Sequence, residues 1–538
     1  MKKWQIISKN KAEDVITFLR QNRGLTLHPP DPYTLTPKDV GIHKKSLTDA
    51  LTRIHAAIKN KESIVVYADY DADGITAGAI MWETLHALGA QVMPYIPHRV
   101  DEGYGLSQKG IDAVKAQYNP TLIITVDHGI TAWEKVAYAK SLGIEVIITD
   151  HHTKPEKLPD CIIVHTTGLC GAGVSWFVAK ELSGQSNEEH VALASVGTIA
   201  DLVPLVGVNR SIVKYGLAVI NNTKRVGLNA LIREAGLIKG ALSTYDISHV
   251  LGPRLNAMGR LVHAMDALRL LCTRQEDKAM FLAEKLGVTN RDRQKLTEET
   301  VTHACEVLQD TLLRTQESVL SKKLIFVSHE SYNPGIIGLV AGKLVEEFYR
   351  PSVVLSKGEL ISKGSARSIA GFNIVEAIKS CSDILIDVGG HPMAAGFTVE
   401  TKYLEELEHR LLELADKELD EEKLTRSLRI DAEIPLSQAD EELWTALRDF
   451  EPFGIGNPEP VFSTSQVEVL DSRLVGKDGK HMKLKIRQGS TTVDAIAFGL
   501  GSMQTSLRDK PVDIAYCLDM NTWNGNTRLQ LKIKDIRV

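Results

Sequence analysis

Residues 63–74 read Ser63-Ile64-Val65-Val66-Tyr67-Ala68-Asp69-Tyr70-Asp71-Ala72-Asp73-Gly74. A short apolar run, rich in β-branched residues, passes here directly into three alternating aspartates. The pattern returns twice, because residues 121–126 run into Asp127-His128-Gly129 and residues 145–149 run into Asp150-His151-His152. Short β-branched runs that are separated by helical patterns predict the parallel strands of an α/β sheet.

These acidic ends are expected to lie together at one edge of the predicted sheet. Ligands bind at the carboxyl ends of the strands in such sheets, and neighbouring strands are about 4.8 Å apart. Carboxylates at that spacing repel one another unless a positive charge lies between them. The pattern therefore predicts a divalent metal site at the strand ends.

The pattern of apolar runs, breakers and turns divides the 538 residues into five parts. We predict an N-terminal segment at 1–60, a parallel-sheet domain at 61–205, a helical region and connector at 206–317, a second α/β domain at 318–425 and an all-β module at 426–538. Helices are expected at 75–88, 109–117 and 132–142, and a long connecting helix within 289–311. The predicted fold class is α/β, with two α/β lobes joined by a helical segment and followed by a small β-barrel.

Composition indicates a soluble cytoplasmic protein. The net charge is −5, and six cysteines are scattered without a C-x-x-C pair, which is typical of thiols in a reducing compartment. We see no signal peptide and no run long enough to span a membrane. An acidic balance does not exclude nucleic acid, because local basic patches do the binding.

Mixed carboxylate and imidazole ligands suit Mn²⁺ or Mg²⁺. A further candidate ligand is Asp201, which ends the apolar helical pattern of residues 194–200. Two ions about 3.5–4 Å apart are a common device for hydrolysing a phosphodiester. The first acidic loop alone could instead be a calcium loop of the EF-hand type, but that loop needs a glutamate where this chain has Ile80.

Taken together, these residues resemble the DHH phosphoesterase superfamily, and within it the RecJ family of single-stranded-DNA-specific exonucleases. Asp150-His151-His152 is similar to the superfamily signature, and the other acidic motifs follow in the family's order. Further similar stretches lie at 97–106, 169–174 and 253–260. The resemblance runs from about residue 45 to the C-terminus.

The resemblance implies a role for each motif residue. The implied metal ligands are Asp69, Asp71, Asp73, Asp127, His151 and Asp201. Asp127 is the implied bridge between two ions, while Asp69 either ligates directly or orients a neighbour. His152 is implied as the acid or phosphate-contacting group, and Asp150 as the residue that orients both imidazoles. The implied catalytic residues are thus Asp127, Asp150 and His152.

The second lobe carries two glycine-rich motifs, at 364–368 and 389–397. Glycines allow close approach to a phosphate, although for either motif in isolation a tight turn is the better explanation. The pair resembles the DHH-associated domain, whose family role is to hold substrate. With the similar stretches, it implies a substrate-binding set of Arg99, Tyr104, Arg254, Asn256, Arg260, Arg367, Ser368, Gly389, Gly390 and His391. Asn333 stands where the family often has a histidine.

The C-terminal module opens with residues 452–462, which resemble the lead-in to the family's oligonucleotide-binding (OB) barrel. Its candidate backbone- and base-contacting residues are Lys477, Lys480, His481, Lys483, Lys485, Arg487, Phe498, Tyr516 and Trp523. Basic groups can track phosphates while aromatic rings stack on bases. Ordinary exposed lysines and core aromatics would explain the same composition, and the sequence leaves both interpretations open.

The resemblance implies a metal-dependent 5′→3′ exonuclease of DNA repair and recombination, which releases mononucleotides from single-stranded DNA. It suggests Mn²⁺ or Mg²⁺ as cofactor, two ions bound, and a monomer. Suggested partners are single-strand-binding protein and a RecQ-type helicase. The alternatives are another DHH phosphoesterase that acts on short oligonucleotides or small phosphate substrates, and an inactive DNA-binding scaffold.

Overall fold

The computed structural model describes residues 2–8, 14–26, 28–99, 101–315, 322–476, 478–507, 510–523 and 525–538. The chain folds as two compact units. The first unit comprises residues 19–291 and 446–459, and the second comprises residues 1–18, 292–445 and 460–538. Each unit therefore contains segments that are far apart in the sequence.

The first unit is built on a five-stranded parallel sheet with strand order β3-β2-β4-β5-β6. The strands are β2 (Ser63–Ala68), β3 (Gln91–Tyr95), β4 (Leu122–Val126), β5 (Glu145–Asp150) and β6 (Ile162–His165). The three acidic runs thus form neighbouring strands, β2, β4 and β5, as predicted. β3 pairs with one side of β2 and β4 with the other. Such a reversal of strand order opens a crevice at the carboxyl ends.

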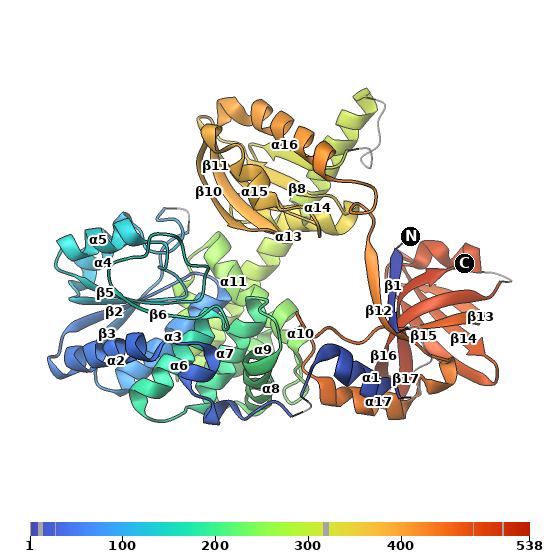
Figure 1. Cartoon of the computed structure of the whole chain (residues 1–538), viewed down its shortest axis with the longest axis horizontal. Helices are drawn as coiled ribbons and strands as arrows, with labels where there is room; N and C mark the ends of the chain where they lie inside the picture. The colour runs from blue at the N-terminus through green and yellow to red at the C-terminus, as the bar shows by residue number, and fades with distance from the viewer. Residues whose placement is uncertain are drawn as a thin grey trace. The chain divides into compact units, whose positions relative to one another are not determined.

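Helices cover both faces of this sheet (Figure 1). One face packs against α4 (Gln108–Tyr118) and α5 (Trp133–Ser141). The other face is buried by α2 (Lys44–Lys59), α3 (Ala72–Ala87), α6 (Gly171–Ser183) and α7 (Glu188–Ala200). The three helices predicted in this domain correspond to α3, α4 and α5. Because α3, α6 and α7 lie inside the unit, they are apolar on nearly every side.

A run of helices completes the first unit. They are α8 (Gly207–Asn222), α9 (Val226–Glu234), α10 (Thr244–Asp246), η3 (Ile247–Leu251), α11 (Gly252–Leu261) and α12 (Met265–Cys272). They are followed by α13 (Glu276–Thr315), a helix of 40 residues that contains the predicted connecting helix at 289–311. Its residues up to Arg291 belong to the first unit and the later ones to the second.

The α/β part of the second unit has a five-stranded sheet of order β10-β11-β9-β8-β7. Its strands are β7 (Ile325–His329), β8 (Ser352–Ser356), β9 (Ile361–Arg367), β10 (Leu385–His391) and β11 (Ala394–Glu400). Only β7 and β8 pair in parallel among these strands. The helices are α14 (Ile337–Phe348), α15 (Ile374–Lys379) and α16 (Leu404–Glu418).

The C-terminal strands form a closed barrel. They are β12 (Ser427–Glu433), β13 (Phe462–Val475), β14 (His481–Gln488), β15 (Thr491–Ala497), β16 (Val512–Trp523) and β17 (Asn526–Arg537). β13 pairs with both β14 and β16, so the chain of pairings β13-β14-β15-β17-β16 closes on itself. Five strands closed in this way are the architecture of an OB fold.

The compact units divide the chain differently from two of the predicted domain bounds. β1 (Lys3–Ser8) pairs with β12 beside the barrel, so residues 1–60 are not one segment of the chain's fold. Residues 446–459, predicted as part of the barrel module, belong to the first unit. In both cases backbone hydrogen bonds to a distant strand or loop override nearness in sequence. The predicted bound at 317/318 lies outside the described residues.

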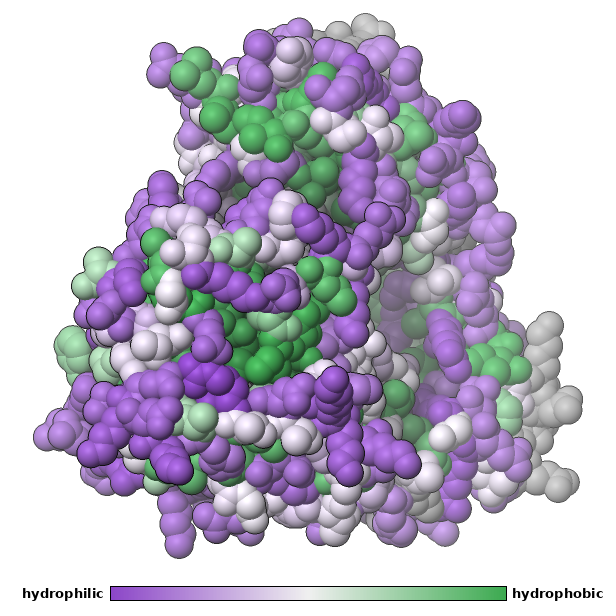
Figure 2. Space-filling model, turned by 60° about the vertical axis from the view of Figure 1, so that its left-hand side comes forward, coloured by the Kyte–Doolittle hydropathy of each residue, from purple (hydrophilic) through white to green (hydrophobic). Residues whose placement is uncertain are grey.

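No helix among the described residues is both long and apolar enough to cross a membrane. The face drawn in Figure 2 is mainly hydrophilic, with hydrophobic side chains gathered in local patches. Both observations agree with the composition, in which charged residues make up 24%.

Candidate active site

The acidic side chains meet at the carboxyl ends of β2, β4 and β5. Three overlapping groups of residues have ligand atoms within 4.8 Å of one another: Asp69, Asp71 and Asp127; Asp73, His151 and Asp201; and Asp127, His151 and His152. All six residues predicted as metal ligands fall into these groups. Asp127 and His151 each belong to two of them, which is the placement that a shared or central ligand requires.

His151 lies at the centre of the carboxylates. Its Nε2 is 3.1 Å from Asp127 Oδ1, 3.7 Å from Asp201 Oδ2 and 3.9 Å from Asp73 Oδ2. Asp201 comes from outside the sheet, since it is the residue that ends α7. One imidazole thus faces carboxylates from β4, from the start of α3 and from the end of α7.

Helix termini hold the first acidic loop. Asp71 caps α3, because its Oδ1 accepts hydrogen bonds from the backbone N–H groups of Asp73 and Gly74, each at 3.0 Å. The Asp73 carboxylate accepts from Gly171 N at 2.6 Å and Ala172 N at 2.8 Å, in the first turn of α6. A helix N-terminus stabilises a carboxylate through its free N–H groups and its dipole. The start of α6 therefore holds the Asp73 carboxylate in place.

Glycines let the backbone approach this cluster. A Cβ on Gly171 would overlap the Asp127 carboxylate, and a Cβ on Gly197 would overlap Asp73 Oδ1. A Cβ on Gly259, in α11, would overlap the carbonyl oxygen of Tyr70. A side chain at Gly171 or Gly197 would have to move an acid, and one at Gly259 would have to move the backbone of Tyr70. Three helices therefore close on the site through glycine.

Asp127 has a backbone conformation that side chains rarely adopt. Its φ is 69°, in the left-handed region, which costs about 1 kcal/mol or more for a residue other than glycine. The conformation directs the carboxylate toward His151 at the end of β4. Such strain is typical of functional positions that the surrounding fold holds in place.

Burial and mutual repulsion raise the pKa values of the clustered aspartates. Burial and the neighbouring carboxylates Asp73 and Asp71 raise the pKa of Asp127 well above its usual range. The same two causes raise the pKa of Asp201 to about 8. For Asp69, burial and the charge of Asp71 raise the pKa well above its usual value. The cluster therefore favours protons or cations over bare negative charge.

The residues present fit a divalent cation. Asp69 Oδ1 and Asp127 Oδ1 are buried and have no hydrogen-bond partner among the described residues. A buried carboxylate oxygen without a partner is costly, and coordination to a cation removes that cost. Carboxylate and imidazole donors together match Mn²⁺ and Mg²⁺.

Asp150 and His152 form a separate pair beside the cluster. Asp150 Oδ1 accepts from His152 Nδ1 at 2.8 Å, and Asp150 Oδ2 accepts from Ile130 N at 2.8 Å. Burial alone would lower the pKa of His152, but the hydrogen bond and charge of Asp150 raise it to about 9. His165 Nε2 lies 2.7 Å from the carbonyl oxygen of His152. Asp150 was predicted to orient both neighbouring imidazoles. Its carboxylate bonds to the ring of His152, but for His151 it accepts from the backbone N–H.

Aromatic and cationic side chains line the approach to His152. The hydroxyl of Tyr104 is 3.3 Å from His152 Nε2, and 54% of Tyr104 is exposed. Tyr104 meets Tyr70 edge to face, with ring centroids 6.2 Å apart. The guanidinium of Arg99 lies over the Tyr70 ring at 4.9 Å. Arg99 and Tyr104, both predicted to bind substrate, are thus linked to the acidic loop through Tyr70.

The predicted substrate residues of α11 have contacts of their own. Asn256 Oδ1 accepts from Ala72 N at 2.7 Å, so Asn256 supports the start of α3. Arg254 pairs with Glu234 at 2.7 Å, which is a bond within the helical region. Burial and the charge of Asp73 raise the pKa of Asp71, and the positive charge of Arg260 partly opposes that rise. Arg260 alone of the three therefore brings charge to the acids.

The second unit holds the glycine-rich motifs. Arg367 ends β9 and donates to the carbonyl oxygen of Ala366 at 2.8 Å. The Ser368 hydroxyl is buried and donates to Phe372 O at 2.7 Å, which makes it a turn-stabilising group. Gly389, Gly390 and the exposed His391 end β10. Asn333 Oδ1 accepts from Gly335 N at 2.7 Å, so this side chain stabilises a turn.

Comparison with known proteins matches each part of the chain. The model of the DHH family, N-terminal domain, matches residues 63–203, the DHHA1 domain matches 317–421, and the RecJ OB domain matches 430–535. The single-stranded-DNA-specific exonuclease RecJ of Salmonella typhimurium is 32% identical, over 91% of this chain and 90% of that protein. The chain belongs to the RecJ family.

Other relatives agree with this assignment. The RecJ of Bacillus subtilis is 38% identical over 96% of this chain, which spans 66% of that relative's length. The crystal structure of Thermus thermophilus RecJ with Mn²⁺ has a TM-score of 0.83 and 30% identity, and covers all of this chain and 79% of its own. The same RecJ with Mg²⁺ gives a TM-score of 0.78. RecJ-family proteins have thus been solved with both ions that suit the residues of this site.

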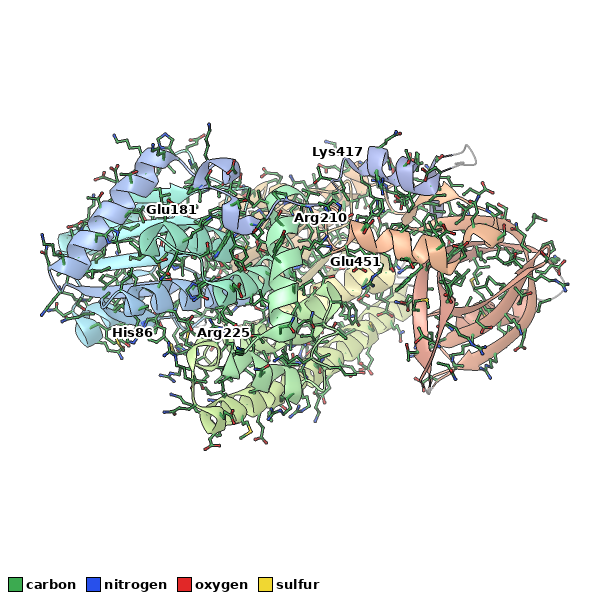
Figure 3. The ribbon with its side chains drawn as sticks, turned by 90° about the horizontal axis from the view of Figure 1, so that it is seen from below. His86, Glu181, Arg210, Arg225, Lys417 and Glu451 are labelled. Carbon is green, nitrogen blue, oxygen red and sulfur yellow. The ribbon has the colours of Figure 1, made fainter. Side chains whose placement is uncertain are left out.

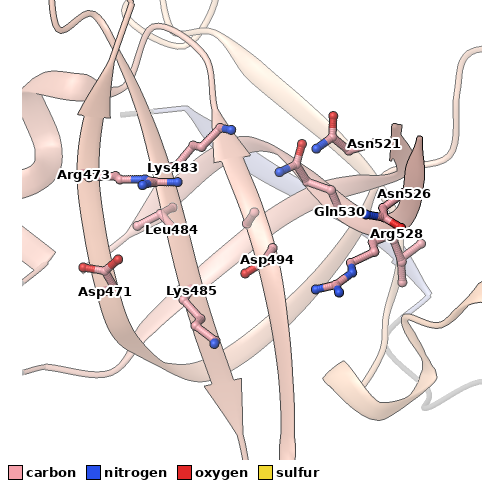
Figure 4. Close-up of a pocket in the computed structure, with 12 residues that line it drawn as sticks. Asp471, Arg473, Lys483, Leu484, Lys485, Asp494, Asn521, Asn526, Arg528 and Gln530 are labelled. Atoms are coloured by element: carbon pink, nitrogen blue, oxygen red, sulfur yellow. The ribbon is translucent and has the colours of Figure 1, made fainter. Parts of the chain in front are cut away.

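The barrel of this RecJ-family chain carries a basic groove. A cavity of about 570 Å³ is lined by residues of β13, β14, β15, β16 and β17 (Figure 4). Arg473, Lys483, Lys485 and Arg528 line it and have no ion-pair partner among the described residues. Asp471 and Asp494 also line it. Four free cations against two acids make this face suited to a phosphate backbone.

The candidate aromatics of the barrel divide between core and surface. Tyr516 is fully buried and lies 2.9 Å from Thr464 Oγ1, so it packs the barrel. Phe498 is 57% exposed and meets the His481 ring at 5.3 Å. Lys477 and the side chain of Trp523 lie outside the described residues. Tyr516 is therefore a core aromatic, while the exposed Phe498 stays a candidate for base stacking.

Sequence reasoning missed residues that pack against the acids of the RecJ-family site or hold the backbone next to them. These are Gly171 and Gly197, which admit the acids, and His165, which holds backbone near them; for Asn256, predicted as a substrate contact, the hydrogen bond to the start of α3 was not foreseen. Small residues inside apolar helices are a usable signal for close approach. Asn256 and His165 carry no such signal, because their contacts span 184 and 13 residues in sequence.

Proposed function

We propose that this chain is a metal-dependent exonuclease that hydrolyses single-stranded DNA from the 5′ end and releases mononucleotides. The observation that carries the proposal is the cluster of five carboxylates and His151 at the strand ends, beside the His152–Asp150 pair, in a chain of the RecJ family. The 5′→3′ direction and the mononucleotide product rest on the family resemblance alone. A role in DNA repair and recombination has the same basis.

Two groups of residues would hold the metal ions. Asp69, Asp71 and Asp127 form one group, and Asp73, His151 and Asp201 form the other. Divalent ions bound there would supply an activated water and stabilise the charge on the leaving oxygen. Asp127 belongs to the first group and lies 3.1 Å from His151 of the second, so it is placed to serve both.

His152 supplies a proton at Nε2. Its Nδ1 is held by Asp150 at 2.8 Å, so Nε2 is the atom that faces Tyr104. Because the pKa of His152 is raised to about 9 by Asp150, the imidazolium persists at neutral pH. A cation at this position can contact a phosphate oxygen or protonate a leaving group.

Tyr104 and Arg99 position the strand. The exposed Tyr104 ring offers a face on which a terminal base can stack, a contact worth about 1–3 kcal/mol per base. Arg99, held over Tyr70, adds positive charge beside the acidic loop. In the second unit, Arg367, Gly389, Gly390 and His391 are the proposed phosphate contacts, with the barrel groove as a further track for the backbone.

We further infer a cytoplasmic, monomeric enzyme. All six cysteines are free, which suits a reducing compartment. Single-strand-binding protein and a RecQ-type helicase are proposed partners, and their support is the family resemblance alone.

End-labelled DNA tests the proposal. Single- and double-stranded substrates, labelled at either end, are incubated with Mn²⁺ or Mg²⁺ and the products are resolved by size. We expect mononucleotides from the 5′ end of single strands only, and no cleavage by Asp127→Ala. Preference for dinucleotides over long strands would point to another DHH phosphoesterase. Turnover that needs no metal, or full activity of Asp127→Ala, would contradict the metal assignment.

A further inference from the structure

The first unit contains a large cavity of about 1250 Å³. None of the residues that line it has been assigned a role above. It lies at the far ends of the helices that build the metal centre. α3 begins beside Asp71 and its last turns, at 82–87, line the cavity; α7 begins at the cavity and ends at Asp201. α6 likewise holds Asp73 at its first turn and lines the cavity near its end. These helices therefore separate the cavity from the metal centre.

Two indole N–H groups in its wall have no acceptor. Trp176 is 1% exposed, and the buried Nε1 atoms of Trp176 and Trp82 have no hydrogen-bond partner among the described residues. A buried indole N–H normally finds an acceptor. Because both nitrogens are buried beneath the surface of the cavity, they do not donate to a ligand there, and the wall presents the partly exposed Trp82 ring instead.

A flat aromatic pair lines the same cavity. The rings of Trp82 and His86 are stacked, with centroids 5.1 Å apart and an interplanar angle of 10°. His86 is exposed, and Figure 3 marks it together with Arg225, another lining residue. Stacked aromatic side chains are the surfaces on which heteroaromatic rings bind.

Two of the acidic side chains in the cavity wall are already paired with other side chains of the protein. Glu83 receives both terminal nitrogens of Arg225, at 2.7 and 2.9 Å, and lies 3.0 Å from His190. Burial would raise the pKa of Glu83, but these two partners lower it to about 2. Glu189 accepts from the Thr223 hydroxyl at 2.7 Å. Glu188 is the remaining lining carboxylate.

Two cations at the cavity remain available. Lys224 and Arg274 are exposed, line the cavity and have no ion-pair partner among the described residues. With Lys180 and Arg225, the lining holds four lysine and arginine cations against three carboxylates. Free cations along a cavity wall favour an anionic ligand.

We propose that this cavity is a second ligand site of the chain, and that it binds a nucleotide. The free cations of Lys224 and Arg274 meet the phosphate, and the Trp82–His86 pair stacks on the base. The volume exceeds the roughly 300–1,000 Å³ of typical ligand pockets, so a nucleotide fits inside. The inference holds whether or not the chain degrades DNA, because it uses no residue of the metal centre.

Binding of 2′-deoxyadenosine 5′-monophosphate to the full chain in EDTA, followed by calorimetry, tests this site. We expect saturable one-to-one binding that the double variant Lys224→Glu, Arg274→Glu weakens at least about tenfold, since two attractions become repulsions. The matched control is Lys44→Glu, Lys45→Glu, the same charge change on exposed residues of α2 in the same unit. The control should bind as the unchanged chain does.

Further arms define the ligand class. Trp82→Ala removes the stacking ring, and we expect it to weaken binding at least about fivefold. Deoxyadenosine without phosphate, and inorganic phosphate alone, should each bind more weakly than the nucleotide. Equal binding of inorganic phosphate would overturn the stacking role. Binding that the Lys224, Arg274 variant leaves unchanged, or tighter binding of a short acidic peptide, would overturn the nucleotide site.

Discussion

At the scale of single residues, Asp127 combines features that destabilise the fold with a position suited to metal coordination. It is buried, has left-handed backbone geometry, and has one carboxylate oxygen without a hydrogen-bond partner. Each of these features is unfavourable in the folded chain without a cation. Residues that are poor for stability but well placed for coordination are typical of functional sites.

Asp127→Asn should therefore separate stability from function. Without metal, the substitution removes a charge that burial and Asp73 disfavour, so we expect the free energy of unfolding in EDTA to stay equal or rise by about 1–2 kcal/mol. Nuclease activity in Mn²⁺ should fall at least about a thousandfold. Urea denaturation and a cleavage assay measure the two effects. The exposed Asp49→Asn is the control, and a large loss of stability in Asp127→Asn would contradict this account.

His152 should titrate well above an ordinary histidine in the metal-free chain. Its folded pKa is raised to about 9, so the imidazolium and the stability from its pair with Asp150 are complete below about pH 6.5 and are lost as the pH rises through about 9. Histidine NMR in EDTA, with His152→Gln to assign the signal, measures this pKa. Asp150→Asn should move it down toward 6.5. A His152 signal near 6.5 in the unchanged chain would refute the prediction.

At the scale of helices and strands, the site depends on glycines inside buried helices. Gly197, in α7, faces Asp73 and lies where a Cβ would be 2.6 Å from the Cβ of Ala172 in α6. Two helices and an acid thus meet at a point with no spare volume. The apolar character of α7 therefore does two things: it buries the helix and brings Asp201 to the carboxylates.

Gly197→Ala should lower both stability and activity. A methyl group placed against Asp73 and Ala172 overpacks the core, which costs about 1–3 kcal/mol, and it displaces a metal-site carboxylate. The control is Gly342→Ala in α14, where a Cβ meets nothing within 4 Å; there we expect a gain of up to about 1 kcal/mol. Urea denaturation compares the two. Equal stability of both variants would show that the helices can move apart.

At the scale of the whole molecule, distant segments complete each unit. Arg210, 1% exposed, donates to Thr26 O at 2.6 Å, Asp449 O at 2.8 Å and Glu451 O at 3.1 Å (Figure 3). The first unit therefore includes a loop whose residues Asp449 and Glu451 follow Arg210 by 239 and 241 positions in the sequence. Leu205 N also donates to Ile455 O, at 2.6 Å.

Arg210→Met should release residues 446–459. The substitution leaves three carbonyl groups without their donor, and we expect a loss of about 3 kcal/mol. Hydrogen–deuterium exchange should then rise in residues 446–459 more than elsewhere in the first unit. The exposed Arg429→Met serves as the control. Unchanged exchange in that segment would mean that other contacts suffice to hold it.

The sequence by itself determined β2, β4 and β5, their parallel direction and the acids that end them. β-branched runs that stop at Asp69, Asp127 and Asp150 carry local information, because strand pairing and the position of a carboxyl end follow from short patterns. The helices α3, α4 and α5 were predictable for the same reason. The family motifs added Asp201, which no strand pattern contains.

Only the tertiary structure decided which groups meet. Gly171 and Gly197 pack on acids, Asn256 caps a helix 184 residues away, and β1 joins the sheet of the C-terminal strands. It also revealed the cavity at the far ends of α3, α6 and α7, with its unpartnered indoles. Local propensity cannot specify such contacts, because they depend on packing and on pairing of backbone groups far apart in the chain.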